Sequence, residues 1–407
     1  MFIQQSANDD RPRKVWPSLL GGALALFVAM GVSRFAYTPI LPLMQEETHF
    51  SSAVAGYLAS SNYLGYLFGA FAAGSVSWLR RHRQLAFRCS LCLCIATTGC
   101  MAVTSQTGIW LILRLLSGIS SAVVFVLVSS IVMDDLARQN RQALSGVFYG
   151  GVGLGIAVTG ALVPEINHAF AWQGSWLGMM VLSICLGIPA MGCIRAPITA
   201  ANGQPTAATS HAVANKRLFS WLIVAYGCEG LGYIITATFL VEMASSLPAL
   251  HKFASYLWVV AGMAALPSCL FGAMLARRFG DVQVLVVAYL LQAVGVLLPV
   301  AIPNAFAGCV GAILFGGTFM GITALATNLG RKLRPHNSGG AIGLMTGTYG
   351  IGQVVGAGGA GWLASVSGGF AVPTIISAAV VFAGALVLVV GRVIVLSTDA
   401  EGAQAKR

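Results

Sequence analysis

Long apolar stretches separated by short polar breaks dominate this sequence. Most stretches run for roughly 18 to 28 residues, which lets an α-helix cross the ~30 Å hydrocarbon core of a bilayer. Only 9% of the 407 residues are charged, and a water-soluble surface cannot be built from so few charges. Segments of about 10 residues with alternating hydrophobicity, which would indicate a membrane-spanning β-barrel, are absent. The sequence therefore predicts an all-α integral membrane protein.

The apolar stretches predict twelve transmembrane helices. The first lacks the small-residue cleavage site of a signal peptide and is expected to be retained. The longest polar break, 196–217, leaves six helices on each side, so we expect six-helix bundles over 1–195 and 218–407 with this linker between them. The predicted helices cover 17–44, 52–79, 84–104, 107–134, 142–164, 172–194, 218–244, 253–276, 282–302, 304–330, 338–366 and 369–396.

Lys and Arg are distributed very unevenly over the predicted loops. With a cytoplasmic N-terminus, 20 of the 23 basic residues fall on the inner side, whereas the outer loops keep Lys252 and the helices contain Arg34 and Arg114. The positive-inside rule then predicts that both termini are cytoplasmic, in a multi-pass protein of a bacterial-type inner (plasma) membrane. The same loops explain the net charge of +11 without a nucleic-acid site.

Metal, cofactor and enzyme chemistry have little support in the sequence. The nine cysteines lie within or at the start of predicted helices, and the cluster that begins at Cys89 has no His or acid at ligand spacing. No Gly-rich nucleotide-binding motif with its Lys occurs. The six histidines lie in loops or at helix ends, without paired carboxylates or a Ser-His-acid set. We expect no metal, no cofactor and no enzymatic activity.

The two halves of the chain show traces of an internal repeat. An offset of 196 superimposes the segment 29–37 on 225–233, and an offset of 199 aligns the Gly-rich runs 151–155 and 350–354. Matches this short also occur by chance in Gly-rich helices, but similar spacing across two pairs favours duplication. A parallel six-plus-six repeat with a central linker is similar to the layout of a major facilitator superfamily (MFS) transporter.

Four motifs make this resemblance more specific. The segments 31–44, 56–66 and 229–233 resemble the YbfB/YjiJ branch of the MFS, and the resemblance extends over essentially the whole chain. In the fourth predicted helix, Arg114 and Gly118 resemble the Arg-x-x-x-Gly motif, whose arginine is implicated in proton coupling in many members. The resemblance implies two pseudo-symmetric six-helix bundles around a central cavity, which predicted helices 1, 2, 4, 5, 7, 8, 10 and 11 border.

The superfamily signature between the second and third predicted helices is incomplete. Gly74 is followed by Trp78 where the signature has an acid, and the matching loop in the second half has Gly272 and Ala276. We therefore expect that the adjacent aspartates at the inner end of the fourth helix can pair with the arginines of these two loops instead. The expected cytoplasmic gate residues are Arg80, Arg81, Asp134, Asp135, Arg277 and Arg278.

Three ionisable residues are predicted to lie within the bilayer, where a charge at the centre costs at least ~2.5–3.5 kcal/mol. Arg34 and Glu229 occupy nearly equivalent places in the first and seventh predicted helices, so we expect them to form an ion pair at mid-membrane. Such a pair either takes part in solute or proton binding or only locks the two halves together. Arg114 either joins the site or bonds helix carbonyls and reaches toward the outer interface.

Polar and aromatic side chains recur at helical spacing around these charges. Such stripes occur in predicted helices 1, 2, 7 and 11, whereas helices 3, 6, 9 and 12 show none and are expected to face lipid. The same side chains can simply join helices, but their convergence with the charges favours a binding site. The expected substrate or proton site comprises Arg34, Glu229, Arg114, Tyr37, Asn62, Tyr66, Tyr226, Tyr233, Tyr349 and Gln353. The expected interfacial anchors are Trp16, Trp110, Trp172 and Trp258.

The expected function is secondary active transport of a small solute by rocking of the two bundles. In this hypothesis, protonation of Glu229 releases Arg34 to bind an anionic or hydroxyl-bearing solute, and a proton gradient supplies the energy. A transport-like sensor or a structural membrane protein without solute flux is the alternative. Arg34 favours an anion, but Glu229 and the aromatic residues also allow a cation or an amphiphilic drug. Expected partners are the lipid bilayer, a small-molecule substrate and protons, with the chain as a monomer.

Overall fold

Every regular element that the structure describes is a helix, which confirms the predicted all-α class. The structure is a computed structural model, and it describes residues 15–141, 144–194 and 216–404. Nearly all of the predicted linker, 196–217, lies outside these ranges. The predicted division into domains 1–195 and 218–407 stays a prediction.

We call the helices of residues 15–194 the N-terminal helices and those of residues 216–404 the C-terminal helices. The N-terminal helices are α1 (Val15–Leu26), the π-helical turn η1 (Phe27–Val32), α2 (Tyr37–Thr48), α3 (Ser52–Ser75), α4 (Ser77–Arg81), α5 (Arg83–Cys100), α6 (Thr107–Arg138) and α7 (Ser145–Cys193). The C-terminal helices are α8 (Lys216–Ser246), η3 (His251–Phe253), α9 (Ala254–Phe279), α10 (Asp281–Ala301), α11 (Ala305–Leu333), η4 (Pro335–Asn337), α12 (Ser338–Ser367) and α13 (Ala371–Gln404).

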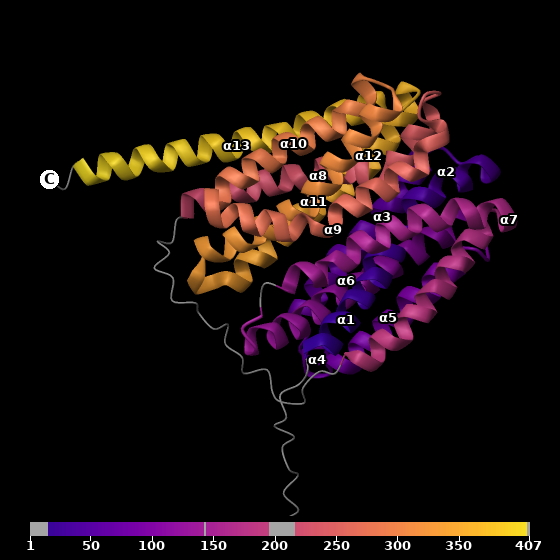
Figure 1. Cartoon of the computed structure of the whole chain (residues 1–407), viewed down its shortest axis with the longest axis horizontal. Helices are drawn as coiled ribbons and strands as arrows, with labels where there is room; N and C mark the ends of the chain where they lie inside the picture. Colours follow the sequence, from indigo (N-terminus) through magenta and orange to yellow (C-terminus); the bar gives the residue numbers. More distant parts are fainter. Residues whose placement is uncertain (1–14, 142–143, 195–215, 405–407) are drawn as a thin grey trace, which may run out of the picture.

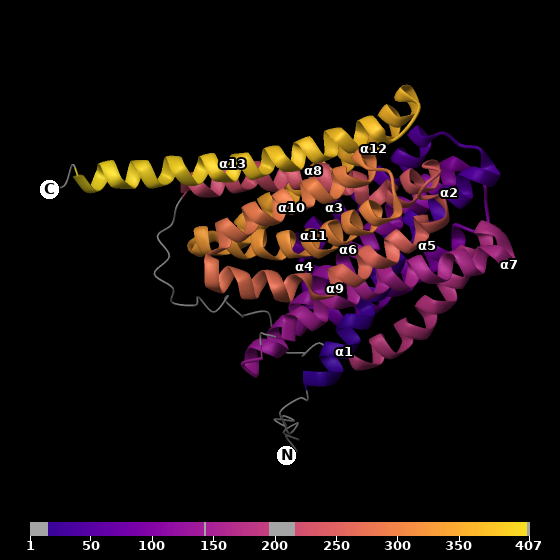
Figure 2. The same ribbon diagram turned by 45° about the horizontal axis from the view of Figure 1, so that its top comes forward.

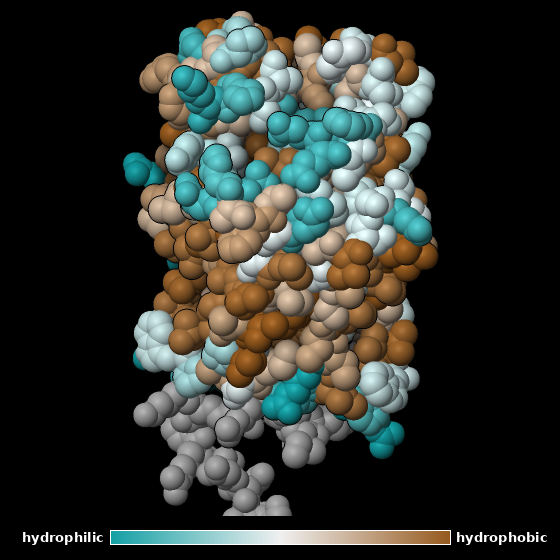
Figure 3. All heavy atoms as spheres, turned by 90° about the vertical axis from the view of Figure 1, so that its right-hand side faces the viewer, coloured by the Kyte–Doolittle hydropathy of each residue, from teal (hydrophilic) through white to brown (hydrophobic). Residues whose placement is uncertain are grey.

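The long helices run back and forth between two ends of the molecule. We name these the Thr48 end, where α2 ends, and the Arg138 end, where α6 ends; they lie at the right and the left of Figure 1. The N-terminal helices and the C-terminal helices form two neighbouring groups, as the two views together show (Figures 1 and 2). Figure 3 faces the Thr48 end, where hydrophilic side chains gather over the upper part and hydrophobic ones over the lower part.

Eight helical segments of the described chain are long and apolar enough to cross a membrane. One of them, α7, extends over 49 residues, and its backbone is non-helical at Phe170 and Ala171, where the chain reverses at the Thr48 end (Figure 1). Three other long helices, α3, α5 and α12, are not among the eight. The apolar helices agree with a membrane protein, while the number of twelve spans and the side on which the termini lie stay predictions.

Three predicted helix boundaries are wrong. The predicted helix 17–44 is interrupted by η1 and by a turn over 33–36. The predicted helix 52–79 ends at Ser75 because Val76 is extended, and α4 is a separate short helix. The predicted loop 165–171 is helical up to Ala169, so the break in α7 is narrower than the polar residues of this segment indicated.

Close helix packing in this fold depends on glycines, whose missing side chains leave room for a neighbouring backbone. On α11, a Cβ atom at Gly316 would collide with the backbone of Ala261 in α9, whereas the same atom at the next residue, Gly317, would meet open space. On α6, a Cβ atom at Gly118 would collide with the carbonyl of Asn62 in α3. These helix pairs are therefore held at backbone contact distance.

Replacing Gly316 with Ala should lower the melting temperature of the detergent-solubilised protein, because overpacking costs about 1–3 kcal/mol. The matched variant Gly317→Ala adds the same methyl group one residue further along. It should leave the melting temperature unchanged or raise it slightly, since Ala favours a helix more than Gly does. Equal melting temperatures for the two variants would contradict the backbone contact between α9 and α11.

Candidate functional site

The first predicted span is interrupted near its middle by a change in backbone hydrogen bonding. In the π-helical turn η1, Ser33 N donates to Val28 O (2.9 Å) and Phe35 N donates to Met30 O (3.0 Å), in each case five residues back. Pro39, in the first turn of α2, has no N–H to donate. Turns of this kind occur frequently at functional sites. The interruption leaves backbone carbonyls in the middle of the span that need donors from elsewhere.

Arg114 of α6 supplies donors to these carbonyls. Its Nη1 donates to Ser33 O (3.2 Å) and its Nη2 to Arg34 O (3.5 Å), while Ser117 Oγ donates to Ser33 O (3.1 Å). The Arg114 guanidinium also lies 4.6 Å from the centre of the Tyr37 ring. Two of the five guanidinium N–H groups therefore have backbone partners. This geometry matches the alternative in which Arg114 bonds helix carbonyls.

Arg34, which extends from the interruption, is surrounded by aromatic rings. Its Cζ lies 4.1 Å from the centre of the Tyr66 ring, 4.9 Å from Tyr63 and 5.4 Å from Phe35. The residue is only 2% exposed, yet its Nε and Nη2 atoms have no hydrogen-bond partner among the described residues. Tyr233 of the C-terminal helices interacts electrostatically with the same guanidinium. Arg34 thus lies where the two groups of helices meet, with two donors unused.

The expected ion pair between Arg34 and Glu229 does not form. Among the described ion pairs none joins these residues, and Glu229 Oε1 instead accepts a hydrogen bond from Gln292 of α10 (2.8 Å). Thr318 of α11 donates to Gln292 Oε1 (3.1 Å). The prediction was wrong because Glu229 stands one residue away from the repeat mate of Arg34, and one residue corresponds to about 100° around a helix. Glu229 therefore points into the C-terminal helices, with its Oε2 atom unpartnered.

The predicted stripes of α8 and α12 do come together, in a stack of aromatic rings. Tyr349 stacks on Tyr226 (ring centres 4.4 Å apart) and on Tyr233 (5.4 Å), and Tyr233 stacks on Phe319 (5.9 Å). Gln353 Nε2 donates to the Tyr233 hydroxyl, and the Oε1 atom of this buried residue has no partner among the described residues. Four of the predicted site residues therefore form one cluster on the C-terminal helices.

Two further predicted site residues join helices of the N-terminal group. The hydroxyl of Tyr37 donates to Ala55 O (3.0 Å), and Asn62 Nδ2 donates to Arg114 O (3.0 Å). Both residues are almost completely buried, at 1% and 0% exposure. Each ties α3 to a neighbouring element, which is the helix-joining alternative for polar residues in a membrane protein.

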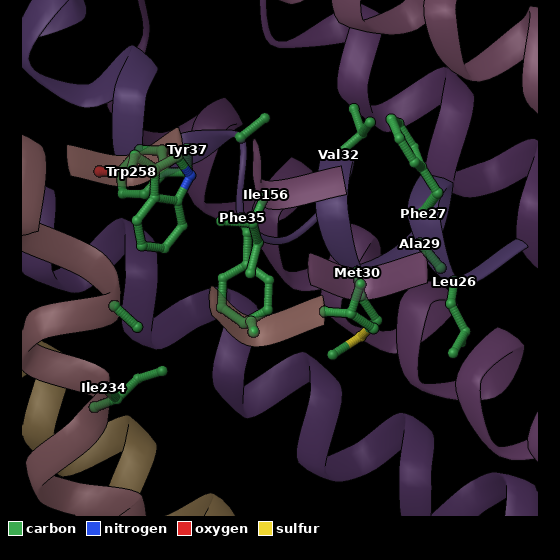
Figure 4. Close-up of a cluster of buried hydrophobic side chains, with 14 of the residues drawn as sticks. Leu26, Phe27, Ala29, Met30, Val32, Phe35, Tyr37, Ile156, Ile234 and Trp258 are labelled. Carbon is green, nitrogen blue, oxygen red and sulfur yellow. The ribbon is translucent and has the colours of Figure 1, made fainter. Parts of the chain in front are cut away.

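Towards the Thr48 end, side chains of the two groups close over the site. Thr38 Oγ1 donates to Ala237 O (2.6 Å), and the Tyr63 hydroxyl bonds Thr238 Oγ1 (2.8 Å). Phe35 packs edge-on against Trp258 of α9, with ring centres 6.2 Å apart, and lies among side chains of both groups (Figure 4). All of these residues are at most 3% exposed.

Towards the Arg138 end, the facing side chains are partly exposed. The partly exposed residues on the facing helices include Tyr66 of α3, Phe125 of α6, Tyr149 of α7, Thr323 of α11 and Tyr349 of α12. The Thr48 side is buried and the Arg138 side is partly exposed, so the site is nearer to solvent from the Arg138 end.

Among the described residues, the aspartates of the predicted gate at the Arg138 end have partners other than Arg81, Arg277 and Arg278. Asp134 lies 3.9 Å from Arg83, and Asp135 accepts a hydrogen bond from Ser18 (2.7 Å). The expected partner Arg81 is exposed, and the Arg80 side chain lies outside the described part of the chain. The basic residues Arg277 and Arg278 of α9 are also exposed. In the described residues, no ion pair joins the N-terminal and C-terminal helices at this end.

Several residues of the site were missed from sequence. Gln292 was overlooked because α10 shows no polar stripe, although a lone amide in an apolar helix is itself a signal of a buried hydrogen bond. Glu242, near the Thr48 end of α8, accepts a hydrogen bond from Ser52 (3.3 Å) and keeps its buried Oε2 unpartnered. Tyr63 was missed although it directly follows Asn62 in the sequence. The expected interfacial anchors are a separate error, since three of the four are buried: Trp110, Trp172 and Trp258.

Comparison with known proteins identifies the family. A family model described as "Uncharacterised MFS-type transporter YbfB" matches residues 26–389. The chain belongs to this family of MFS-type transporters. This confirms the resemblance drawn from the motifs and makes the chain a multi-pass membrane protein of a transporter family.

The individual relatives share little sequence identity with this chain. The uncharacterized MFS-type transporter YceJ of Bacillus subtilis (strain 168) is 26% identical over 162 residues, and YcaD of Escherichia coli O45:K1 is 28% identical over 162 residues. These matches span 40% of the length of each relative, and 40% and 38% of this chain. Two crystal structures of the nucleoside transporter NupG superimpose with TM-scores of 0.75 and 0.71 at 15% and 16% identity, over 93% of this chain. At this identity the similarity shows the fold.

The two buried arginines should respond in opposite ways to the same substitution. Arg114→Met removes donors from buried carbonyls, which should lower the melting temperature in detergent by an amount corresponding to about 1–3 kcal/mol. Arg34→Met removes a buried charge without an ionic partner, so stability should stay the same or rise. Thermal unfolding followed by tryptophan fluorescence measures both. A larger loss for Arg34→Met than for Arg114→Met would contradict the assigned contacts.

Proposed function

We propose that this protein is a secondary active transporter that moves a small solute by alternating access, driven by protons. The observation that best supports the proposal is the position of Arg34: buried, with two unused donors, at the junction of the two groups of helices. A charge in such a place is costly and is retained mainly for a function. We further propose twelve spans in two six-helix bundles, with both termini cytoplasmic, in a bacterial inner membrane.

The burial pattern supports alternating access. Polar and aromatic contacts close the Thr48 side of the site, whereas Tyr66 and Tyr349 are partly exposed towards the Arg138 end. If the Arg138 end is cytoplasmic, as the basic loops predict, this is an inward-facing conformation. In the part of the chain that the structure describes, no ion pair joins the two groups of helices at that end, which agrees with this state. In the outward-facing state, Asp134 is free to meet Arg277 or Arg278 across the closed gate.

We assign different roles to the predicted site residues. Arg34 binds the solute directly, with Tyr66 and Tyr349 as the rings nearest the partly exposed side and Gln353 as a polar contact. Arg114, Asn62 and Tyr37 position Arg34 by holding the interrupted span. Tyr226 and Tyr233 support Tyr349 by stacking.

Glu229 is the proposed proton-binding residue. Its carboxyl group is 0% exposed and has no cation within ion-pair distance among the described residues. An ionised carboxylate in such surroundings is unfavourable, so gain and loss of a proton would change the packing around it. The hydrogen bonds to Gln292 and onward to Thr318 connect α8, α10 and α11, which gives protonation a path to helix movement.

A sensor that binds a solute without moving it is the competing function. Reconstitution in proteoliposomes, with a panel of metabolites and with or without an imposed pH gradient, separates the two. Accumulation of a solute that depends on the gradient supports the transporter. Binding of a solute without flux in either direction would overturn it.

Replacing Glu229 with Gln should abolish accumulation driven by a pH gradient while leaving solute counterflow, which needs no net proton movement. Gln keeps the shape of the side chain and an oxygen that accepts from Gln292, so the fold should be preserved. The control Glu165→Gln changes an exposed acid of α7 and should behave like the native protein. Unchanged gradient-driven accumulation in Glu229→Gln would remove this residue from the mechanism.

A further inference from the structure

We infer that the solute is an organic monoanion: a carboxylate, held by Arg34, on a flat aromatic body that lies against the tyrosines. This inference rests on the proposed function and adds the chemical class of the solute. It is built from the charge of Arg34, the direction of its unused donors, the rings around it and one unused acceptor nearby.

No acid among the described residues compensates the charge of Arg34 by an ion pair. An arginine in a protein stays protonated, and Arg34 has no ion-pair partner among the described residues. The two buried acids of α8 have other hydrogen-bond partners, since Glu229 accepts from Gln292 and Glu242 accepts from Ser52. The rings of Tyr63 and Tyr66 compensate part of the charge by cation–π contact, which is worth at most a few kcal/mol. One bound negative charge would complete the balance, whereas a cationic solute would add to the repulsion.

The unused donors of Arg34 have the geometry of a carboxylate receptor. Nε and Nη2 are the two unpartnered nitrogens, and they lie on the same edge of the guanidinium plane. Their N–H groups point in parallel, which is the fork that binds both oxygens of one carboxylate. The face of the guanidinium is covered by the Tyr66 ring at 4.1 Å, so an anion approaches along this edge.

The surroundings of this edge favour a flat body behind the carboxylate. Tyr66 interacts with Phe125 (ring centres 6.4 Å apart) on the N-terminal side, and Tyr349 stacks on Tyr226 and Tyr233 on the C-terminal side. Tyr66 and Tyr349 are partly exposed and both lie near Arg34. A flat body in this place meets the edge of Tyr349, because both faces of that ring are covered by Tyr226 and Tyr233. An edge-to-face aromatic pair contributes about 0.5–1.5 kcal/mol beyond its buried area.

One acceptor nearby can bind a ring hydroxyl. Gln353 Nε2 donates to the Tyr233 hydroxyl, which leaves the buried Oε1 atom of Gln353 unpartnered. Tyr233 interacts electrostatically with Arg34, so Gln353 is linked to the arginine through the single residue Tyr233. A hydroxyl on the aromatic ring would satisfy it. The best-matched simple probe is therefore 4-hydroxybenzoate, followed by benzoate.

The test is a binding measurement on the full-length protein in nanodiscs, by calorimetry and thermal shift. The probes are 4-hydroxybenzoate, benzoate, its neutral amide benzamide, the non-planar cyclohexanecarboxylate, phenyl phosphate and the neutral nucleoside uridine. We expect benzamide and uridine to bind about 10- to 100-fold more weakly than benzoate. Neither probe offers two negatively charged oxygens to the two N–H groups of Arg34. Cyclohexanecarboxylate should bind more weakly than benzoate, since it cannot stack.

Variants assign the binding to Arg34. Arg34→Met should abolish binding of both benzoates, and Arg34→Lys should weaken it because a lysine has no planar fork. The control Arg138→Met changes an exposed arginine at the end of α6 and should leave binding unchanged. Gln353→Leu should remove the advantage of 4-hydroxybenzoate over benzoate and spare benzoate itself. The melting temperature of each variant without ligand shows that it is folded.

The outcomes separate this inference from the proposed function. Failure of every carboxylate to bind, equal binding of benzamide and benzoate, tighter binding of phenyl phosphate, or undiminished binding in Arg34→Met would each overturn the carboxylate site. Uptake of uridine into proteoliposomes without carboxylate binding would leave transport standing and overturn the inference. Carboxylate binding that depends on Arg34, without flux in proteoliposomes, would keep the inference and overturn transport.

Discussion

Two backbone carbonyls in the middle of the first span determine much of this structure. In a regular helix the N–H groups of Tyr37 and Thr38 would satisfy the carbonyls of Ser33 and Arg34, but Thr38 N donates to Phe35 O here. In a protein interior surrounded by lipid, such carbonyls must find donors in a neighbouring helix. Arg114 and Ser117 of α6 provide them. The first span is thereby fixed against α6 in an interrupted conformation from which Arg34 reaches the junction of the two helical groups.

The two buried arginines consequently have opposite characters. Arg114 has carbonyl partners for both of its terminal nitrogens, and it contributes to stability as a local hydrogen-bond donor. Arg34 has aromatic rings around it and no anionic partner among the described residues, so its charge is retained at a cost in stability. Sites that bind a ligand commonly keep such unfavourable groups, because the ligand supplies the missing interaction. The two residues are of the same type, and only the difference in their partners separates Arg114 from Arg34, the proposed binding residue.

The sequence was sufficient for the all-α class, for the family resemblance and for the grouping of four candidate residues on the C-terminal helices, since apolar runs, motifs and helical stripes are local properties. It was not sufficient for contacts between helices. The sequence predicts Arg34 and Glu229 at nearly the same depth, but depth does not determine on which side of a helix a residue lies, and Glu229 contacts Gln292 instead. The aromatic stripe of Tyr226 and Tyr233 was predicted correctly as one face because residues seven apart stay aligned on a helix. The interruption at residues 33–36 left no clear signal beyond a glycine and a proline.

The contacts between the two groups of helices on the Thr48 side use two kinds of acceptor. Thr38 and Ser60 of the N-terminal helices donate to the main-chain oxygens of Ala237 and Val354, whereas Tyr63 bonds the Thr238 side chain. A main-chain acceptor is present whatever side chain stands at that position, so the first two bonds depend only on the N-terminal hydroxyls. Each hydroxyl contributes about 1 kcal/mol, so the loss of Thr38 or Ser60 would weaken the contact between the two groups in a small step.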